Sequence, residues 1–206
     1  MSYVDEVTYD DLPGLHYITP IENLPSILEH GILSHARVEE IDHESVADSE
    51  VQERRAEKRV PEGRPLHEYV NLYFHARNPM MYKRRGQHED LCVLSVHKRI
   101  LKQEGVVIAD RNASSKYVRF GRGADDLEIL DDQWVYARDW THPSRIAYME
   151  HRSVKCAEVL IPDHVAPTHM RRIFVSCEES KERVKGIVED LEVKVHSDLF
   201  FQQGHG

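Results

Sequence analysis

The sequence is built from short apolar runs that do not follow the regular strand–helix alternation of a parallel sheet. Runs of strand length occur at 15–19, 69–74, 90–97, 105–110, 154–161, 172–176 and 192–197. Helices are expected at 21–31, 77–86, 131–140 and 178–191, with Gly31 as the stop of the first. We find no repeat and no linker, so this pattern favours an α+β fold with a split or largely antiparallel sheet in one domain, residues 1–206.

Charge and cysteine content limit the class of protein. The chain carries 27 basic and 36 acidic side chains, a net charge of −9, so any site for a polyanion must be a local patch. The three cysteines, Cys92, Cys156 and Cys177, are odd in number and widely spaced, which argues against a disulfide framework. The acidic leader, 1–13, has no apolar core, so we expect no signal peptide, no membrane segment and a cytoplasmic location.

The stretch "SVKCAEVLIP" places one carboxylate in an apolar strand. Because side chains alternate along a strand, Glu158 shares its face with Cys156 and Leu160. Three interpretations are open: a surface glutamate on a half-exposed strand, a carboxylate paired with an arginine, or a carboxylate fixed at the floor of a cleft. A strand would hold a catalytic group more rigidly than a loop does.

Basic residues gather in three places: "ERRAEKR" at 53–59, "YKRRG" at 82–86, and the loop 111–122. In that loop the basic residues alternate with Tyr117 and Phe120, which suits a single-stranded nucleic acid whose bases stack while its phosphates pair. The alternative is a solvated face whose charges are paired with neighbouring glutamates. The polar segment 36–59 has no clear apolar stripe, so it is either a loop region or a segment kept for function.

Several common chemistries find no support in the motifs. Neither His164 with His169 nor His88 with Cys92 has a known metal-ligand spacing, so we expect no metal. The chain has no GxSxG elbow and no Walker loop, and "GRG" is too short for a dinucleotide fingerprint. A nucleophilic Cys156 stays open, although its apolar strand favours a core position.

Five stretches in order carry a more specific signal. They are "LHYITPIENLPSIL" with "EHGIL", "VQERRAEKRVP", "LHEYVNLYFHARNPMMY", "VVIADRNASSKYVRF" and "KCAEVLIP". With them the chain resembles the DarT family of bacterial DNA ADP-ribosyltransferase toxins over nearly its whole length. The resemblance implies a split-sheet ADP-ribosyltransferase fold with NAD in its cleft. It also implies transfer of ADP-ribose to a base of single-stranded DNA, and a macrodomain antitoxin that removes the modification.

The resemblance also assigns roles. Glu158 matches the family's catalytic glutamate, and Arg54 matches its key arginine, for catalysis and for NAD. The other residues expected at NAD are His16, Tyr17, Thr19, Asn23, Tyr73 and Met80. Tyr17 stands where relatives often have histidine, and His16 should face the other way.

The expected nucleic-acid contacts combine the basic pattern with the resemblance. They are Arg55, Arg77, Arg84, Arg85, Arg111, Asn112, Lys116 and Arg119, with segment 36–59 covering NAD and DNA. The sequence "RNASS" lacks a histidine that some thymine-modifying relatives have near Asn112, which favours guanine over thymine as the target base. Two rivals remain: an ADP-ribosyltransferase acting on RNA or protein, and an NAD-independent nucleic-acid-binding or ribonuclease-type toxin that uses His97 and His151.

Overall fold

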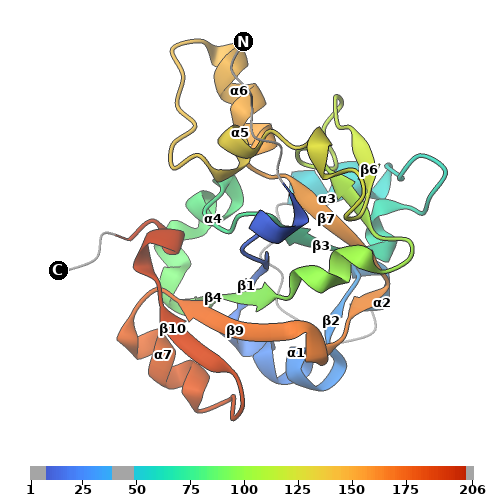
Figure 1. Ribbon diagram of the computed structural model, residues 1–206. Coiled ribbons are helices and arrows are strands. Elements are labelled where there is room, and N and C mark those ends of the chain that lie inside the picture. Colours follow the sequence, from blue (N-terminus) through green and yellow to red (C-terminus); the bar gives the residue numbers. More distant parts are fainter. Residues whose placement is uncertain (1–7, 39–48, 203–206) are drawn as a thin grey trace.

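The structure, a computed structural model, describes residues 8–38 and 49–202 (Figure 1). Within these ranges the largest sheet has the strand order β10-β9-β4-β1-β3-β7-β5-β6. Its strands are β1 (Leu15–Pro20), β3 (Tyr69–Tyr73), β4 (Leu91–Val96), β5 (Val107–Ala109), β6 (Phe120–Arg122), β7 (Glu158–Pro162), β9 (Met170–Val175) and β10 (Glu192–Val195). Among their pairings only β9 with β10 is parallel, which confirms the predicted α+β class with a largely antiparallel sheet.

The sheet is nearly cut in two between β1 and β3. These strands share the single pair His16 and Tyr73, whereas β1 pairs with β4 along its whole length from Leu15 to Pro20. One line of paired residues crosses all eight strands through this junction: Glu192, Arg172, Ser95, His16, Tyr73, Glu158, Ala109 and Phe120. Glu158 therefore lies one strand away from the point where the two halves of the sheet separate.

Helices lie at both ends of the sheet. They are α1 (Leu24–His30), α2 (His35–Val38), α3 (Ser49–Ala56), α4 (Pro79–Arg84), α5 (Asp132–Tyr136), α6 (Arg145–Val154) and α7 (Glu178–Lys185). A small second sheet joins β2 (Ile32–Leu33) to β8 (His164–Val165). Short 3-10 turns lie at Tyr9–Asp11, Ile21–Asn23, Leu66–Glu68, Arg85–Asp90, Lys98–Lys102, Leu127–Ile129, Pro167–His169 and Ser197–Phe200. In Figure 1, α5 and α6 lie at the end of the molecule opposite β9 and α7.

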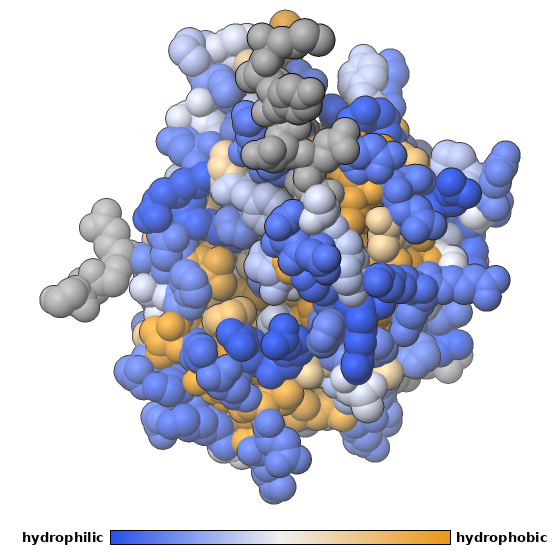
Figure 2. All heavy atoms as spheres, viewed as in Figure 1, coloured by the Kyte–Doolittle hydropathy of each residue, from blue (hydrophilic) through white to orange (hydrophobic). Residues whose placement is uncertain are grey.

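Both faces of the sheet are packed. The larger core contains Leu94, Leu72 and Val159, and smaller clusters on the other face centre on Met81 and Leu160. The surface in view in Figure 2 is mainly hydrophilic, with smaller apolar areas between the charged side chains. None of the described helices is long and apolar enough to cross a bilayer.

Most predicted elements are present, and the differences have local causes. The strand expected at 154–161 begins only at Glu158, because the helix α6 runs to Val154. The helix expected at 178–191 ends at Lys185, directly before Gly186. Gly31 ends α1 with a φ of 82°, and a Cβ there would meet the Val165 carbonyl oxygen at 2.3 Å. Of segment 36–59, residues 39–48 lie outside the described residues, as do 1–7 of the leader.

Candidate active site

A cavity of about 890 Å³ opens where the sheet divides. Its walls include the consecutive residues 17–20 of β1 and 69–71 of β3. Because neighbouring residues of a strand point to opposite faces, consecutive lining residues mean that the cavity reaches the edges of both strands. The volume is within the range of small-molecule and cofactor sites, about 300–1,000 Å³.

Glu158 lies in this cavity and is only 1% exposed. Its Oε2 accepts a hydrogen bond from Arg55 Nη1 at 2.8 Å, and its Oε1 accepts one from the Ala113 amide at 3.2 Å. A buried carboxylate needs such partners, since an unpaired buried charge is costly. The interpretation of a surface glutamate is wrong, because Glu158 is buried, whereas pairing with an arginine and a position in the cleft both describe the structure.

The arginine on Glu158 is Arg55, which the sequence assigned to nucleic acid. Arg55 comes from α3, is 4% exposed, and its Nη2 is buried without a hydrogen-bond partner among the described residues. Arg54, the residue expected to be the key arginine, is exposed and also lines the cavity. Successive helical residues point about 100° apart, so only one of the two can face Glu158. A buried guanidinium with an unfilled donor at a cavity suits a ligand that offers oxygen acceptors.

The expected NAD residues gather at the cavity with one exception. Tyr17, Thr19, Asn23, Tyr73 and Met80 all line it, and Asn23 Nδ2 donates to Thr19 Oγ1 at 3.1 Å.

His16 does not line the cavity. His16 is 8% exposed and pairs with Tyr73 at the junction of the sheet halves, and burial lowers its pKa to about 4. Neutral His16 therefore belongs to the junction of β1 and β3.

The expected nucleic-acid residues divide into two groups. Besides Arg55, Asn112 and Lys116 line the cavity, and Asn112 Oδ1 accepts from the Ser114 amide at 2.9 Å. The others lie outside the cavity lining: Arg77, Arg84, Arg85, Arg111 and Arg119. Several of these bind acidic groups of the chain; Arg111 and Arg119 both contact Asp110, at 3.2 and 2.9 Å. For these two arginines the alternative of a charge paired within the protein describes the structure.

Sequence reasoning missed several lining residues. Helix α6 contributes Met149, Arg152 and Ser153, and the rings of His35 and His67 stack with centroids 4.3 Å apart at the cavity. A signal for α6 existed: Ser144, the N-cap residue, accepts from the Ala147 amide, and serine is a preferred N-cap. Nothing in the sequence indicated that α6 would reach the cleft.

Within the described residues, the geometry does not favour a metal site, a Cys156 nucleophile or a reaction carried by His97 and His151. In the two described ranges no three His, Cys, Asp or Glu side chains come together to hold a metal ion. Burial raises the pKa of Cys156 to about 12, so its thiol is protonated at neutral pH and unsuited to nucleophilic attack. Neither His97 nor His151 lines the cavity, and His151 instead contacts the Trp134 carbonyl at 3.0 Å and His142 at 2.7 Å.

Several known proteins are similar to this chain in sequence and in fold. A family model described as "ssDNA thymidine ADP-ribosyltransferase, DarT" matches residues 16–201. The chain is 33% identical over 195 residues to a DNA ADP-ribosyl transferase–DNA ADP-ribosyl glycohydrolase fusion protein of Thermosipho africanus. That match takes in 91% of this chain and 48% of the fusion protein, so the chain spans about half the length of this relative.

Two solved structures of the Thermus sp. 2.9 DarT are also similar. The complex with ADP-ribosylated single-stranded DNA has a TM-score of 0.80 at 27% identity, over 95% of this chain and 99% of that one. The complex with NAD+ has a TM-score of 0.75 at 26% identity, over 94% and 100%.

The relatives and solved structures that share this fold form a class of DNA ADP-ribosyltransferases. Within that class, the chain belongs to the DarT family.

Proposed function

We propose that the chain is an NAD-dependent mono-ADP-ribosyltransferase that modifies a base of single-stranded DNA and releases nicotinamide. The observation that carries the proposal is Glu158, a buried carboxylate held by Arg55 and the Ala113 amide in a cavity between two halves of a sheet. The Thermus relative solved with NAD+ and with ADP-ribosylated DNA supports the same pair of substrates. We treat residues 1–206 as one ADP-ribosyltransferase domain.

The reaction breaks the bond between nicotinamide and C1 of its ribose, and nicotinamide leaves with the electron pair. Positive charge develops on the ribose, as in glycoside transfer. Glu158 stabilises that charge and can accept the proton that the attacking base nitrogen loses. Because Arg55 and Ala113 already orient both carboxylate oxygens, the group is preorganised for this work.

NAD is a substrate whose fit can be judged from the cavity walls. Tyr17, Thr19, Asn23, Tyr73 and Met80 offer aromatic surface and short polar groups on both sides of the division. The unfilled Arg55 Nη2 offers a donor for an oxygen of a substrate, and Arg54 at the wall is placed to orient the base or the phosphates. His16 is left out of this set, since it does not line the cavity.

The single-stranded DNA runs past Asn112 and Lys116, with α6 beside them. The described parts of segment 36–59, residues 36–38 and 49–59, are proposed to cover NAD and DNA, since α2 and α3 bring His35 and Arg54 to the cavity. The family description names thymidine, whereas the missing histidine near Asn112 favours guanine. We keep both bases as candidates. Oligonucleotides that contain thymine without guanine, or guanine without thymine, separate them.

A macrodomain antitoxin that removes the modification is the proposed partner of a toxin acting in the bacterial cytoplasm. The support is the Thermosipho relative, in which a DNA ADP-ribosyl transferase is joined to a DNA ADP-ribosyl glycohydrolase. Treatment of the modified oligonucleotide with such a glycohydrolase should restore its original mass. An adduct that resists it would argue against a reversible toxin–antitoxin pair.

The decisive experiment measures intact masses. The protein is incubated with NAD and short single-stranded DNA and RNA oligonucleotides, beside Glu158→Ala and a surface control, Lys185→Ala. We expect an added ADP-ribose on DNA alone, present with the control and absent with Glu158→Ala. Adducts on RNA would change the acceptor, and no adduct with NAD unconsumed would overturn the proposal.

A further inference from the structure

Helices α5 and α6 and the residues between them form a lobe, residues 132–154, at one end of the molecule (Figure 1). The lobe brings Met149 and Arg152 to the cavity wall. It also holds the neighbouring loop, because the Asn112 amide donates to the Ser153 carbonyl at 3.0 Å. Val135, Trp140, His151 and Val154 are buried within the lobe, whereas Ile146 on the outer side of α6 is 80% exposed.

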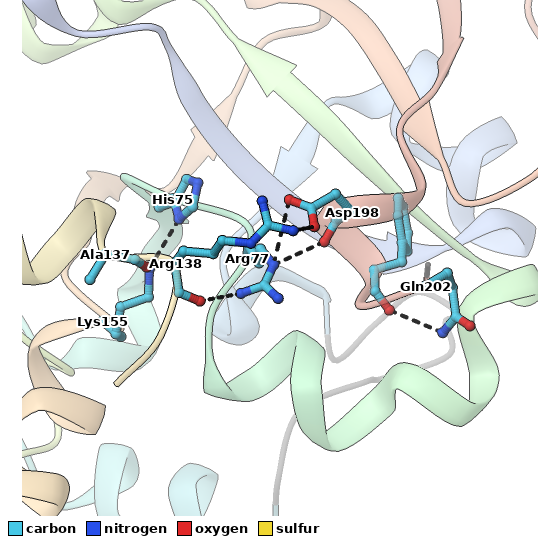
Figure 3. Close-up of polar contacts among 8 residues, drawn as sticks. His75, Arg77, Ala137, Arg138, Lys155, Asp198 and Gln202 are labelled. Carbon is cyan, nitrogen blue, oxygen red and sulfur yellow. Dashed lines mark hydrogen bonds and ion pairs between the residues drawn. The ribbon is translucent and has the colours of Figure 1, made fainter. Parts of the chain in front are cut away.

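A buried lysine fastens this lobe. Lys155 directly follows α6 and is 1% exposed. Its Nζ donates to the carbonyls of Val135 and Ala137 at 2.8 and 2.7 Å, and contacts His75 Nδ1 at 3.1 Å (Figure 3). An ammonium has three N–H donors, so all three are used. The two carbonyls lie at the end of α5, where helix carbonyls lack partners within the helix.

A second set of hydrogen bonds holds the residues that directly follow α5. Arg77 Nη1 donates to the Arg138 carbonyl, and Arg77 Nε donates to the Asp198 carbonyl at 3.1 Å. Arg138 Nη2 in turn donates to Asp198 Oδ1 at 2.6 Å (Figure 3). Residues 137–138 are thus tied to the segment after β3 and to the C-terminal turn. This network explains why Arg77 is not available at the cavity.

We propose that Lys155 is a positioning residue for the nucleic-acid half of the reaction, holding the α5–α6 lobe so that Met149, Arg152 and Asn112 form the wall against which DNA binds. The inference rests on the proposed function. Lys155 acts through the lobe and touches no substrate. The NAD half of the cavity depends on it less, because Tyr17, Thr19 and Asn23 come from β1 and the turn after it, and Glu158 is held by Arg55 and Ala113.

The first test uses Lys155→Met, which keeps the stem and removes the donors, beside the exposed control Lys185→Met. The KM for a DNA oligonucleotide at saturating NAD is compared with the Kd for NAD from calorimetry. We expect the oligonucleotide KM to rise about tenfold or more, as for the loss of charged hydrogen bonds, while the NAD Kd stays within about twofold. An unchanged oligonucleotide KM, or an equal loss of NAD affinity, would overturn the proposal.

Asp198→Asn supplies a second variant that does not disturb the buried lysine. It weakens the ties to Arg77 and Arg138 from the partly exposed side. We expect a smaller rise of the oligonucleotide KM, about two- to fivefold, with NAD affinity unchanged. No change here would count against the proposal even if Lys155→Met failed to fold. A wild-type protein that modifies no DNA would instead mark the failure of the proposed function.

A pH profile separates positioning from stability. Burial lowers the pKa of Lys155 to about 8, and above that pH the amine has two donors for three acceptors. Around it, His75 is neutral because its pKa is lowered to about 3, Cys156 is protonated below its pKa of about 12, and burial lowers the pKa of Arg77. Burial also lowers the pKa of His151 and raises that of Tyr136, so both side chains remain neutral as the pH rises above 8.

The expected profile follows from the sign of the Lys155 shift. A lowered pKa means that the unfolded chain binds the extra proton between about pH 8 and 10.5, so this group raises stability there. An increase in oligonucleotide KM above pH 8 therefore cannot come from unfolding driven by Lys155. We expect that increase in the wild type and a flat profile in Lys155→Met. The same increase in both proteins would assign it to another group, such as Lys58, and overturn this role for Lys155.

Discussion

Two regions of this protein carry ion pairs in opposite settings. At the cleft, Arg55 and Glu158 form a pair whose side chains are 5% and 1% exposed. Along α7 the pair Lys185–Glu182 joins side chains that lie largely in solvent, and in Lys181–Glu178 the glutamate is 71% exposed and the lysine 24%. Exposed pairs contribute little to stability, whereas a buried pair must first overcome the loss of hydration of both ions. The cleft pair is therefore best explained by what it does in the reaction.

The comparison predicts its largest effect at Arg55. Arg55→Met removes one partner and leaves the Glu158 carboxylate buried without its counter-charge. The free energy of unfolding should fall by about 3–5 kcal/mol. Urea denaturation measures it, with Arg59→Met, an exposed arginine a few residues on in the same basic cluster, as the control. A loss below about 1 kcal/mol would show that solvent reaches the pair more than the structure indicates.

Replacing both partners sharpens the comparison. In Arg55→Met/Glu158→Met no charge is left in the cavity floor, so most of the stability lost in the single variant should return. The double variant should remain inactive in the mass assay. A folded, stable and inactive protein would separate the catalytic value of the pair from its structural value. A double variant as unstable as Arg55→Met would mean that the pair itself supports the fold.

The junction of the sheet halves should make the fold sensitive to acid. Burial lowers the pKa of His16 from its ordinary value of 6.5 to about 4, so the unfolded chain binds the extra proton between these pH values. Stability from this group is present above pH 6.5 and is lost as the pH falls towards 4, at about 1.4 kcal/mol per pH unit. Denaturation of His16→Gln over the same range should show a shallower dependence. Parallel curves would contradict this assignment.

A smaller effect is expected at Arg54. Arg54→Lys keeps the charge at the cavity wall and loses the planar fork that can bind two acceptors at once. Transfer to DNA should fall about tenfold, with stability unchanged because the side chain is exposed. Initial rates and a thermal melt test both statements. Full turnover by Arg54→Lys would show that Arg54 does not need to bind two acceptors at once.

The smallest change is predicted on α7. Lys185→Ala breaks the pair with Glu182, a contact of 3.0 Å between side chains that are 51% and 69% exposed. The free energy of unfolding should change by less than about 0.5 kcal/mol. Activity should not change. A larger loss of stability would contradict the statement that exposed ion pairs contribute much less to this fold than the buried Arg55–Glu158 pair.

Local patterns in the sequence were enough to predict most strands and the α1 stop at Gly31. They drew attention to Glu158, but its catalytic role came from the resemblance to the DarT family. Other features depend on contacts between distant segments. Arg54 and Arg55 are adjacent and chemically identical, and only the docking of α3 on β7 decides which one meets Glu158. Likewise, Arg77 is bonded to Asp198, 121 residues away, and no local signal in the sequence indicated this contact. The position of α6 at the cleft also depends on contacts between segments that are distant in the sequence.

The division between β1 and β3 also bears on self-association. A strand edge with free backbone groups invites another chain to add a strand, and proteins usually protect such edges at the rim of a sheet. Here two edges lie inside the molecule, on either side of a cavity that the junction at His16 and Tyr73 closes at one end. These edges therefore face a cavity of a size that suits a small molecule, and not the outer rim of the sheet, where another chain could add a strand.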